Sequence, residues 1–124
     1  MASGDVLETF TLAGWGYGLL LADLIDEYLM QYYAMVSHGY TRGTWIAPES
    51  SYVNRTQQSP SFATPAGLIS PLYLKWALVF EDPQSRTLWL GKATPPEWLS
   101  EGETVEMAEA PTAYGRVGLW IHSR

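Results

Sequence analysis

Cysteine is absent from the 124-residue sequence, which excludes disulfide bonds, cysteine-ligated zinc, iron–sulfur clusters and thiol nucleophiles. Basic residues are few: seven lysines and arginines stand against 13 acidic residues, and the net charge is −6. Because no basic stripe could neutralise phosphates, we expect no nucleic-acid partner. With only two histidines a histidine-rich metal site is excluded, and we expect neither a metal nor another cofactor.

Long apolar runs are missing as well. The apolar stretch that begins at Leu19 is interrupted by Asp23, Asp26 and Glu27, far short of the roughly 20 residues that a membrane span needs. The N-terminal segment lacks the basic region and apolar stretch of a secretory signal. Together with the lack of cysteine, these absences favour a cytoplasmic protein that contacts no membrane.

Aromatic side chains are what the sequence has in excess. Six tryptophans and eight tyrosines stand against three phenylalanines. Trp and Tyr combine a large apolar ring with a polar donor, which suits the half-exposed wall of a ligand cleft or an interface. A core that uses Trp and Tyr is the equally weighted alternative.

The expected fold is α+β in a single domain over 1–124. Apolar residues recur at helical spacing over 19–38, where Pro and Gly are absent, and Gly39 is a natural residue to close that helix. Ser70 as an N-cap with Pro71 after it predicts a second helix over 70–80. We expect the two helices to pack together with Leu24 and Trp76 buried.

The C-terminal part changes period, from helical to alternating. A small antiparallel β region is expected over 86–122, and its last strand alternates Val117, Leu119 and Ile121 with Gly118, Trp120 and His122. A helical hairpin with a long loop over 14–83 would therefore precede a β-rich segment over 84–124.

Glu49 is the carboxylate that the sequence places most suggestively. It lies in the long loop near Arg42, Trp45 and Tyr52, and a sugar site uses aromatic faces for stacking and charged or amide groups for the hydroxyls. Cleavage of a glycosidic bond needs two carboxyl groups. The second could be Asp23, Asp26 or Glu27, or Glu81 or Asp82, and the sequence does not choose. Taken alone, Glu49 is more simply a surface carboxylate paired with a nearby arginine.

Two runs carry a family resemblance, Y-A-M-V-S-H-G-Y-T-R-G-T-W-I-A-P-E over 33–49 and T-P-A-G-L-I-S-P-L-Y-L-K-W-A-L-V-F-E-D-P over 64–83. They resemble the last helical hairpin of an (α/α)6-barrel, or six-hairpin, glycoside hydrolase, and 87–121 resembles the β-rich segment after such barrels. The resemblance implies a carbohydrate ligand, with Arg42, Trp45 and Glu49 in the loop that lines the sugar cleft. It also implies a fragment, because only one hairpin is supplied.

The leading hypothesis is a carbohydrate-active protein of glycoside hydrolase descent that hydrolyses glycosidic bonds, with Glu49 as acid or base and Trp45, Tyr52 and Trp98 as stacking surfaces. Its site would be completed by oligomerisation, and a homodimer through Tyr28, Tyr32 and Met35 is expected. The alternatives are a non-catalytic carbohydrate-binding or self-associating fragment and, ranked last, a carrier of small apolar ligands.

Overall fold

The structure is a computed structural model that describes residues 6–41, 43–52 and 62–124. The described residues form an α+β fold, as the sequence predicts, and divide into two compact units, Met1–Tyr73 and Leu74–Arg124. Within the described part of the chain, no helix is long and apolar enough to cross a membrane. The elements of the first unit are β1 (Val6–Glu8), α1 (Leu12–Leu21), α2 (Ile25–Gly39), β2 (Ser50–Tyr52) and the beginning of α3 (Thr64–Leu78).

The stretch over 19–38, expected to be one helix, is two helices, because α1 ends at Leu21 and α2 begins at Ile25. Asp23 has a φ of +61°, and the Leu24 N–H donates to the Leu19 C=O at 2.9 Å. The Asp23 N–H donates to the Leu20 C=O at 3.3 Å, which completes a Schellman motif with aspartate where glycine is usual. Leu24 lies in this turn and is 42% exposed, so its expected burial is wrong.

The second expected helix begins earlier and ends sooner than the sequence indicated. α3 spans Thr64–Leu78, with Pro65 in its first turn, while Ser70 and Pro71 lie inside it. Ser70 is therefore not an N-cap, and Trp76 is half-buried rather than buried. Proline inside a helix removes one backbone donor and crowds the preceding turn.

A buried tyrosine cluster forms the core of the first unit. The Tyr28 and Tyr73 rings stack with centroids 4.9 Å apart, and Tyr32 stacks on Tyr73 at 6.1 Å. The Tyr28 hydroxyl donates to the Tyr73 C=O at 2.6 Å. Met35 is also buried. The face of α2 that we expected to form a dimer interface is thus covered by the chain itself, so Tyr28, Tyr32 and Met35 are not exposed to a second copy, and the dimer stays a prediction.

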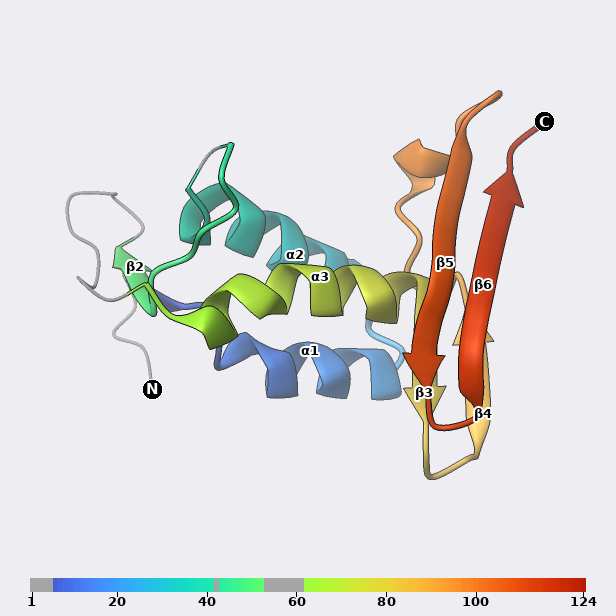
Figure 1. Cartoon of the computed structure of the whole chain (residues 1–124), viewed down its shortest axis with the longest axis horizontal. Helices are drawn as coiled ribbons and strands as arrows, with labels where there is room; N and C mark the ends of the chain where they lie inside the picture. Colours follow the sequence, from blue (N-terminus) through green and yellow to red (C-terminus); the bar gives the residue numbers. More distant parts are fainter. Residues whose placement is uncertain (1–5, 42, 53–61) are drawn as a thin grey trace. The chain divides into compact units, whose positions relative to one another are not determined.

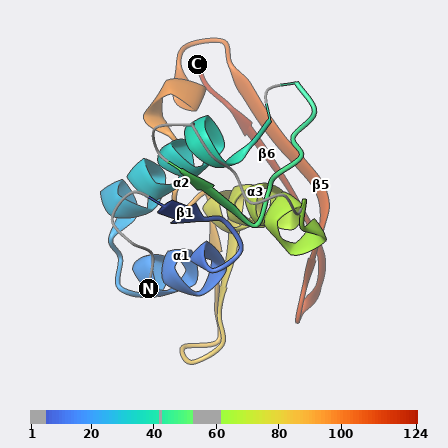
Figure 2. The same cartoon turned by 90° about the vertical axis from the view of Figure 1, so that its left-hand side faces the viewer.

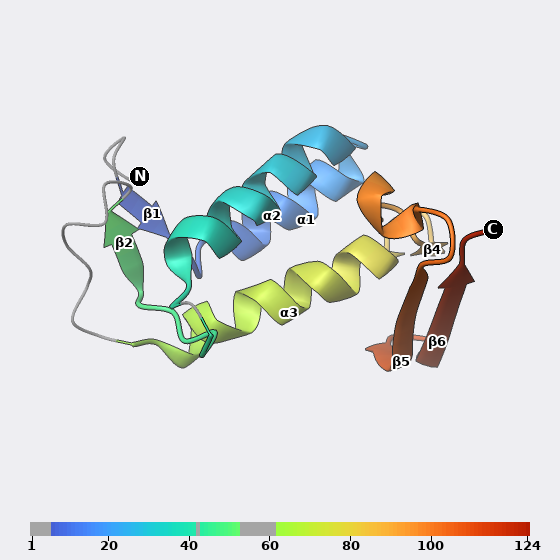
Figure 3. The same cartoon turned by 90° about the horizontal axis from the view of Figure 1, so that it is seen from above.

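The strands of the described residues form three separate antiparallel pairs. β1 pairs with β2 at the end of the first unit seen in Figure 2, where both contact α2. α1 and α2 lie side by side in Figure 3. Gly39 ends α2, and a Cβ there would lie 2.9 Å from the Thr9 Oγ1. Gly39 therefore permits a close approach, and it does not close the helix in the left-handed conformation that we expected.

The second unit contains two hairpins and a short 3₁₀ helix: β3 (Val79–Asp82), β4 (Thr87–Leu90), η1 (Pro96–Leu99), β5 (Thr104–Thr112) and β6 (Gly115–His122). Glu81 joins the hairpins, because its carboxylate accepts from the Lys75 Nζ at 2.9 Å and from the Ala113 N–H at 2.6 Å. Both hydrogen bonds, that from Ala113 first, lower the pKa of Glu81. The side chains that face inward pack into one core: Leu78, Val79, Leu88, Val105, Met107, Ala110, Val117 and Leu119.

Candidate functional site

The loop after α2 is closed by its own backbone. The Thr41 N–H donates to the Ile46 C=O at 2.8 Å, and the Thr41 C=O accepts from the N–H groups of Thr44 and Trp45 at 3.3 and 3.1 Å. Trp45 adopts a φ of +58° in this loop. The left-handed region is rare for a bulky residue and costs of order 1–3 kcal/mol. The surrounding hydrogen bonds hold Trp45 in this strained conformation.

In this backbone conformation the Trp45 side chain lies at the surface. Trp45 is 55% exposed, and its ring lies 5.8 Å from the Tyr40 ring at an interplanar angle of 56°. The ring is thus supported on one side by Tyr40 while more than half of the residue faces solvent. A large exposed apolar ring in a strained backbone position gains little from burial, which makes Trp45 a candidate functional residue.

Tyr40 also connects this loop to α3. Its hydroxyl donates to the Ala66 C=O at 2.6 Å and accepts from the Ser70 N–H at 2.9 Å. These two backbone groups would bond each other in a regular α-helix. The hydroxyl is therefore inserted into the helix one residue before Pro71, where a side-chain insertion is a recognised cause of bending. Burial raises the pKa of Tyr40, so the hydroxyl stays protonated and able to donate.

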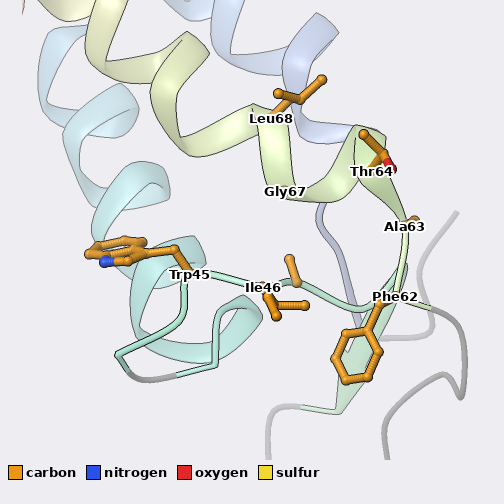
Figure 4. A pocket seen from close by; sticks show the side chains of 8 residues that line it. Trp45, Ile46, Phe62, Ala63, Thr64, Gly67 and Leu68 are labelled. Carbon is orange, nitrogen blue, oxygen red and sulfur yellow. The ribbon is translucent and has the colours of Figure 1, made fainter.

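An open apolar groove lies between the loop and the beginning of α3. Its volume is about 300 Å3, and Figure 4 shows Trp45 toward one end and Phe62 toward the other. The lining residues are Trp45, Ile46, Ala47, Phe62, Ala63, Thr64, Gly67 and Leu68. Four of these are large apolar residues that remain about half exposed or more. The Thr64 side chain is the polar one in this lining.

Glu49 is exposed and directly precedes β2. Its C=O accepts a hydrogen bond from the Thr9 N–H at 3.2 Å. Glu8 lies opposite Ser50 in the β1–β2 pair, so this bond places Thr9 opposite Glu49, one position further along. Because neighbouring residues of a strand face opposite sides, we expect Glu8 and Glu49 to point away from each other. Thr9 and Ser51 are buried on this ribbon, and their hydroxyls have no hydrogen-bond partner among the described residues.

The acidic residues near the beginning of α2 lie too far from Glu49 to pair with it. Asp26 and Glu27 are in the first turn of α2, whereas Gly39 at its other end is next to Thr9, which bonds the Glu49 backbone. A 15-residue helix is about 22 Å long, well beyond the roughly 5–9.5 Å that separates the carboxyl groups of a glycosidase. These candidates for a second carboxylate on α2 are therefore excluded.

The remaining predicted site residues are divided between elements. Tyr52 is half-buried in β2, paired with Val6, and Arg42 lies outside the described residues. Trp98 is half-buried on η1 and belongs to the second unit. Glu81 and Asp82 are in β3 rather than at a helix end. The described site thus consists of Trp45 and Glu49 in one loop, with Tyr40 behind it.

Sequence reasoning missed Tyr40, Phe62 and Leu68. The insertion of Tyr40 into α3 joins segments far apart in the chain and leaves no local pattern. Leu68 lies on the exposed side of α3 and lines the groove. In the described ranges, no group of three or more acidic or histidine side chains could hold a metal ion.

No protein-family model, curated protein or solved structure matches the chain. The resemblance to six-hairpin glycoside hydrolases therefore stays an interpretation of the sequence, and the site has to be judged by its own geometry.

Proposed function

We propose that the chain binds carbohydrate without cleaving it, with Trp45 as the stacking surface. The observation that carries the proposal is the strained, 55% exposed Trp45, whose ring is supported by Tyr40. A pyranose ring has an apolar C–H face, and an immobilised aromatic ring can bury that face at little cost in side-chain entropy. Glu49 in the same loop supplies an acceptor for sugar hydroxyl groups, and cytoplasmic residence belongs to the same proposal.

Catalysis is the less favoured role, because the described first unit offers Glu49 no carboxylate that faces it at the required separation. The Glu49→Gln variant separates the two roles. For a binding site, we expect wild-type protein to leave aryl glycosides intact, and Glu49→Gln to weaken sugar binding by about 1–3 kcal/mol at most. If wild type hydrolyses an aryl glycoside and Glu49→Gln lowers turnover at least ~10²-fold, the site is catalytic and the binding-only proposal is wrong.

Self-association is a second candidate, favoured by the large apolar side chains that line the groove. Ile46, Phe62 and Leu68 are exposed together with Trp45, and contiguous exposed apolar surface often marks a protein interface. Light scattering across a concentration series tests this candidate. A mass that rises with concentration in wild type and not in Leu68→Ser would assign the groove to a second copy of the chain, and a constant monomeric mass would leave it to a ligand.

The direct test of the proposal is calorimetric titration with neutral oligosaccharides. Removal of the ring in Trp45→Ala should weaken binding at least about tenfold, equivalent to ~1.4 kcal/mol. Equal affinities of Trp45→Ala and wild type would refute the role of Trp45, and the absence of binding by wild type to any neutral oligosaccharide of the panel would refute the carbohydrate proposal.

A further inference from the structure

A second exposed tryptophan lies on the outward face of the β5–β6 hairpin, in a unit to which the proposed site does not belong. Val105, Met107 and Leu119 pack against the core of the second unit. The residues between them in sequence face the other way, and Trp120, directly opposite Glu106, is 64% exposed. The long hairpin that carries Trp120 is labelled β5 and β6 in Figure 1.

The Trp120 indole lies along its own strand. A Cβ added to Gly118, two residues earlier on the same face, would lie 2.7 Å from Cζ3 and 2.8 Å from Cη2 of Trp120. The benzene end of the indole therefore covers the position that a side chain at Gly118 would occupy. Any residue other than glycine would push the ring away from the strand.

Aromatic cover of a strand glycine can be purely structural, since it shields the backbone. Two observations point beyond that role. Trp120 retains well over half its exposure in this position, and hydrogen-bonding groups surround it on the same face. Glu106 is its cross-strand partner. On the next same-face pair, the His122 Nδ1 lies 3.2 Å from the Thr104 Oγ1, which leaves Nε2 available to a ligand.

Trp89 in the same unit provides a contrast. It is also exposed, but the Lys92 Nζ lies 4.2 Å from the centroid of its ring, in the geometry of a cation–π contact. One face of Trp89 is therefore occupied by a side chain of the protein itself. Trp120 is the better candidate for a stacking surface in this unit.

We propose that Trp120 is a second carbohydrate-binding surface, which stacks on the C–H face of a pyranose ring. Glu106 accepts a hydrogen bond from a sugar hydroxyl, and the His122 Nε2 makes a further polar contact at the edge. The carboxylate beside the ring, on a chain of net charge −6, favours neutral over acidic sugars, because a uronate would be repelled. This inference rests on the proposed carbohydrate-binding function and adds a separate site to it.

The experiment follows the indole N–H signals of the six tryptophans in ¹H–¹⁵N spectra of the whole chain, assigned with single Trp→Phe variants. The probes are neutral hexasaccharides of β-1,4-linked glucose, mannose and xylose, with the galacturonate hexasaccharide as the charged comparison. We expect the Trp120 signal to shift with the best neutral hexasaccharide at a lower concentration than with the galacturonate.

Three variants and one control then test the geometry. Trp120→Ala should weaken binding at this site at least about tenfold, and Gly118→Ala should weaken it although the indole is still present, because its ring must move. Glu106→Gln should weaken it by about two- to tenfold. Tyr114→Ala, which removes an exposed aromatic residue from the β5–β6 turn, should leave it unchanged, and urea unfolding checks that each variant is folded.

The outcomes separate this inference from the function on which it rests. A shift of the Trp45 signal with an unmoved Trp120 signal overturns the second site and leaves the first intact. A shift of Trp120 alone supports the second site and removes Trp45 from the proposal. If neither signal moves with any neutral hexasaccharide, both proposals fail. If Trp120 binds the sugar and Gly118→Ala binds it as tightly as wild type, the position of the indole along its strand is not needed for binding, and that part of the proposal is wrong.

Discussion

Two glycines of the same helix should respond to alanine substitution with opposite signs. Gly16 and Gly18 both lie in α1, where replacing glycine by alanine ordinarily stabilises a helix by about 0.5–1 kcal/mol. A Cβ at Gly18 meets no atom within 4 Å, so Gly18→Ala should show this gain. A Cβ at Gly16 would overlap the Tyr73 side chain at its hydroxyl end, and that ring is stacked in the buried core.

The size of the Gly16→Ala effect follows from the contacts of Tyr73. Its hydroxyl lies 2.7 Å from the Leu12 C=O, to which it can donate, and 2.6 Å from the Gln31 Oε1. Forcing the ring away costs about 1–3 kcal/mol for overpacking and about 0.5–1.5 kcal/mol for a lost hydrogen bond, while helix propensity returns about 0.5–1 kcal/mol. We therefore expect Gly16→Ala to destabilise the chain by about 0.5–4 kcal/mol.

Urea unfolding, followed by far-ultraviolet circular dichroism, measures both variants against wild type. The comparison requires equal m-values, so that a shift of the midpoint reports stability alone. A stabilised Gly16→Ala, or the same sign of change in both variants, would refute the close approach of Tyr73 to α1. The two substitutions are chemically identical and only two residues apart. Their effects on the unfolded state are therefore similar and largely cancel when the variants are compared.

Three further predictions concern the tyrosines and the buried hydroxyls. Burial raises the pKa of Tyr28 and Tyr73. Their contribution to the free energy of unfolding should therefore be complete below the unfolded pKa of about 10, and above it should fall by up to ~1.4 kcal/mol per pH unit for each tyrosine. If spectrophotometry of the folded chain showed that every tyrosine titrates near pH 10, this prediction would be wrong. Tyr40→Phe removes the hydroxyl inserted into α3 and should cost about 1–2 kcal/mol in urea unfolding, whereas Tyr33→Phe at an exposed position should stay within about 0.5 kcal/mol of wild type. Ser51→Ala removes a buried hydroxyl without a described partner and should leave thermal stability unchanged or raise it, so a clear loss would reveal a partner for that hydroxyl.

The C-terminal strands could be predicted because their pattern is local. The alternation of Val117, Leu119 and Ile121 with Gly118, Trp120 and His122 matches the burial of β6, with the first set half-buried and the second exposed. Pairing with β5 buries one face only, and in that case period-two alternation reports the fold directly. The β-bulge between Met107 and Ala110 gave no comparable signal.

Helix boundaries were less predictable because the residues at them act against their usual preferences. Asp23 occupies the left-handed position that normally calls for glycine, so the break between α1 and α2 is invisible to a rule based on glycine. Pro71 is tolerated inside α3, where Tyr40 takes up two backbone groups of the preceding turn. The better start signal in the sequence is Pro65, which lies in the first turn of α3.

The candidate site could be predicted in part. Trp45 and Glu49 were assigned to one loop from composition and resemblance, and both are exposed there. The strain at Trp45 and the support from Tyr40 depend on tertiary contacts that no pattern encodes. The face with Tyr28 and Tyr32 was assigned to a second copy of the chain because an apolar stripe does not say what covers it; Tyr73 of the same chain stacks on both rings.

The most direct test of the proposed function compares two exposed tryptophans of the first unit. Trp15 on α1 and Trp45 are both largely solvent-exposed, so Trp15→Ala and Trp45→Ala remove similar apolar surface. The two residues differ in that, among the described aromatic contacts, Tyr40 supports the Trp45 ring and not the Trp15 ring. The measurement is the dissociation constant of each variant for the best-binding neutral hexasaccharide, by calorimetry. We predict an increase of at least about tenfold for Trp45→Ala and no more than about twofold for Trp15→Ala. Equal dissociation constants for the two variants would contradict the assignment of Trp45 as the stacking surface.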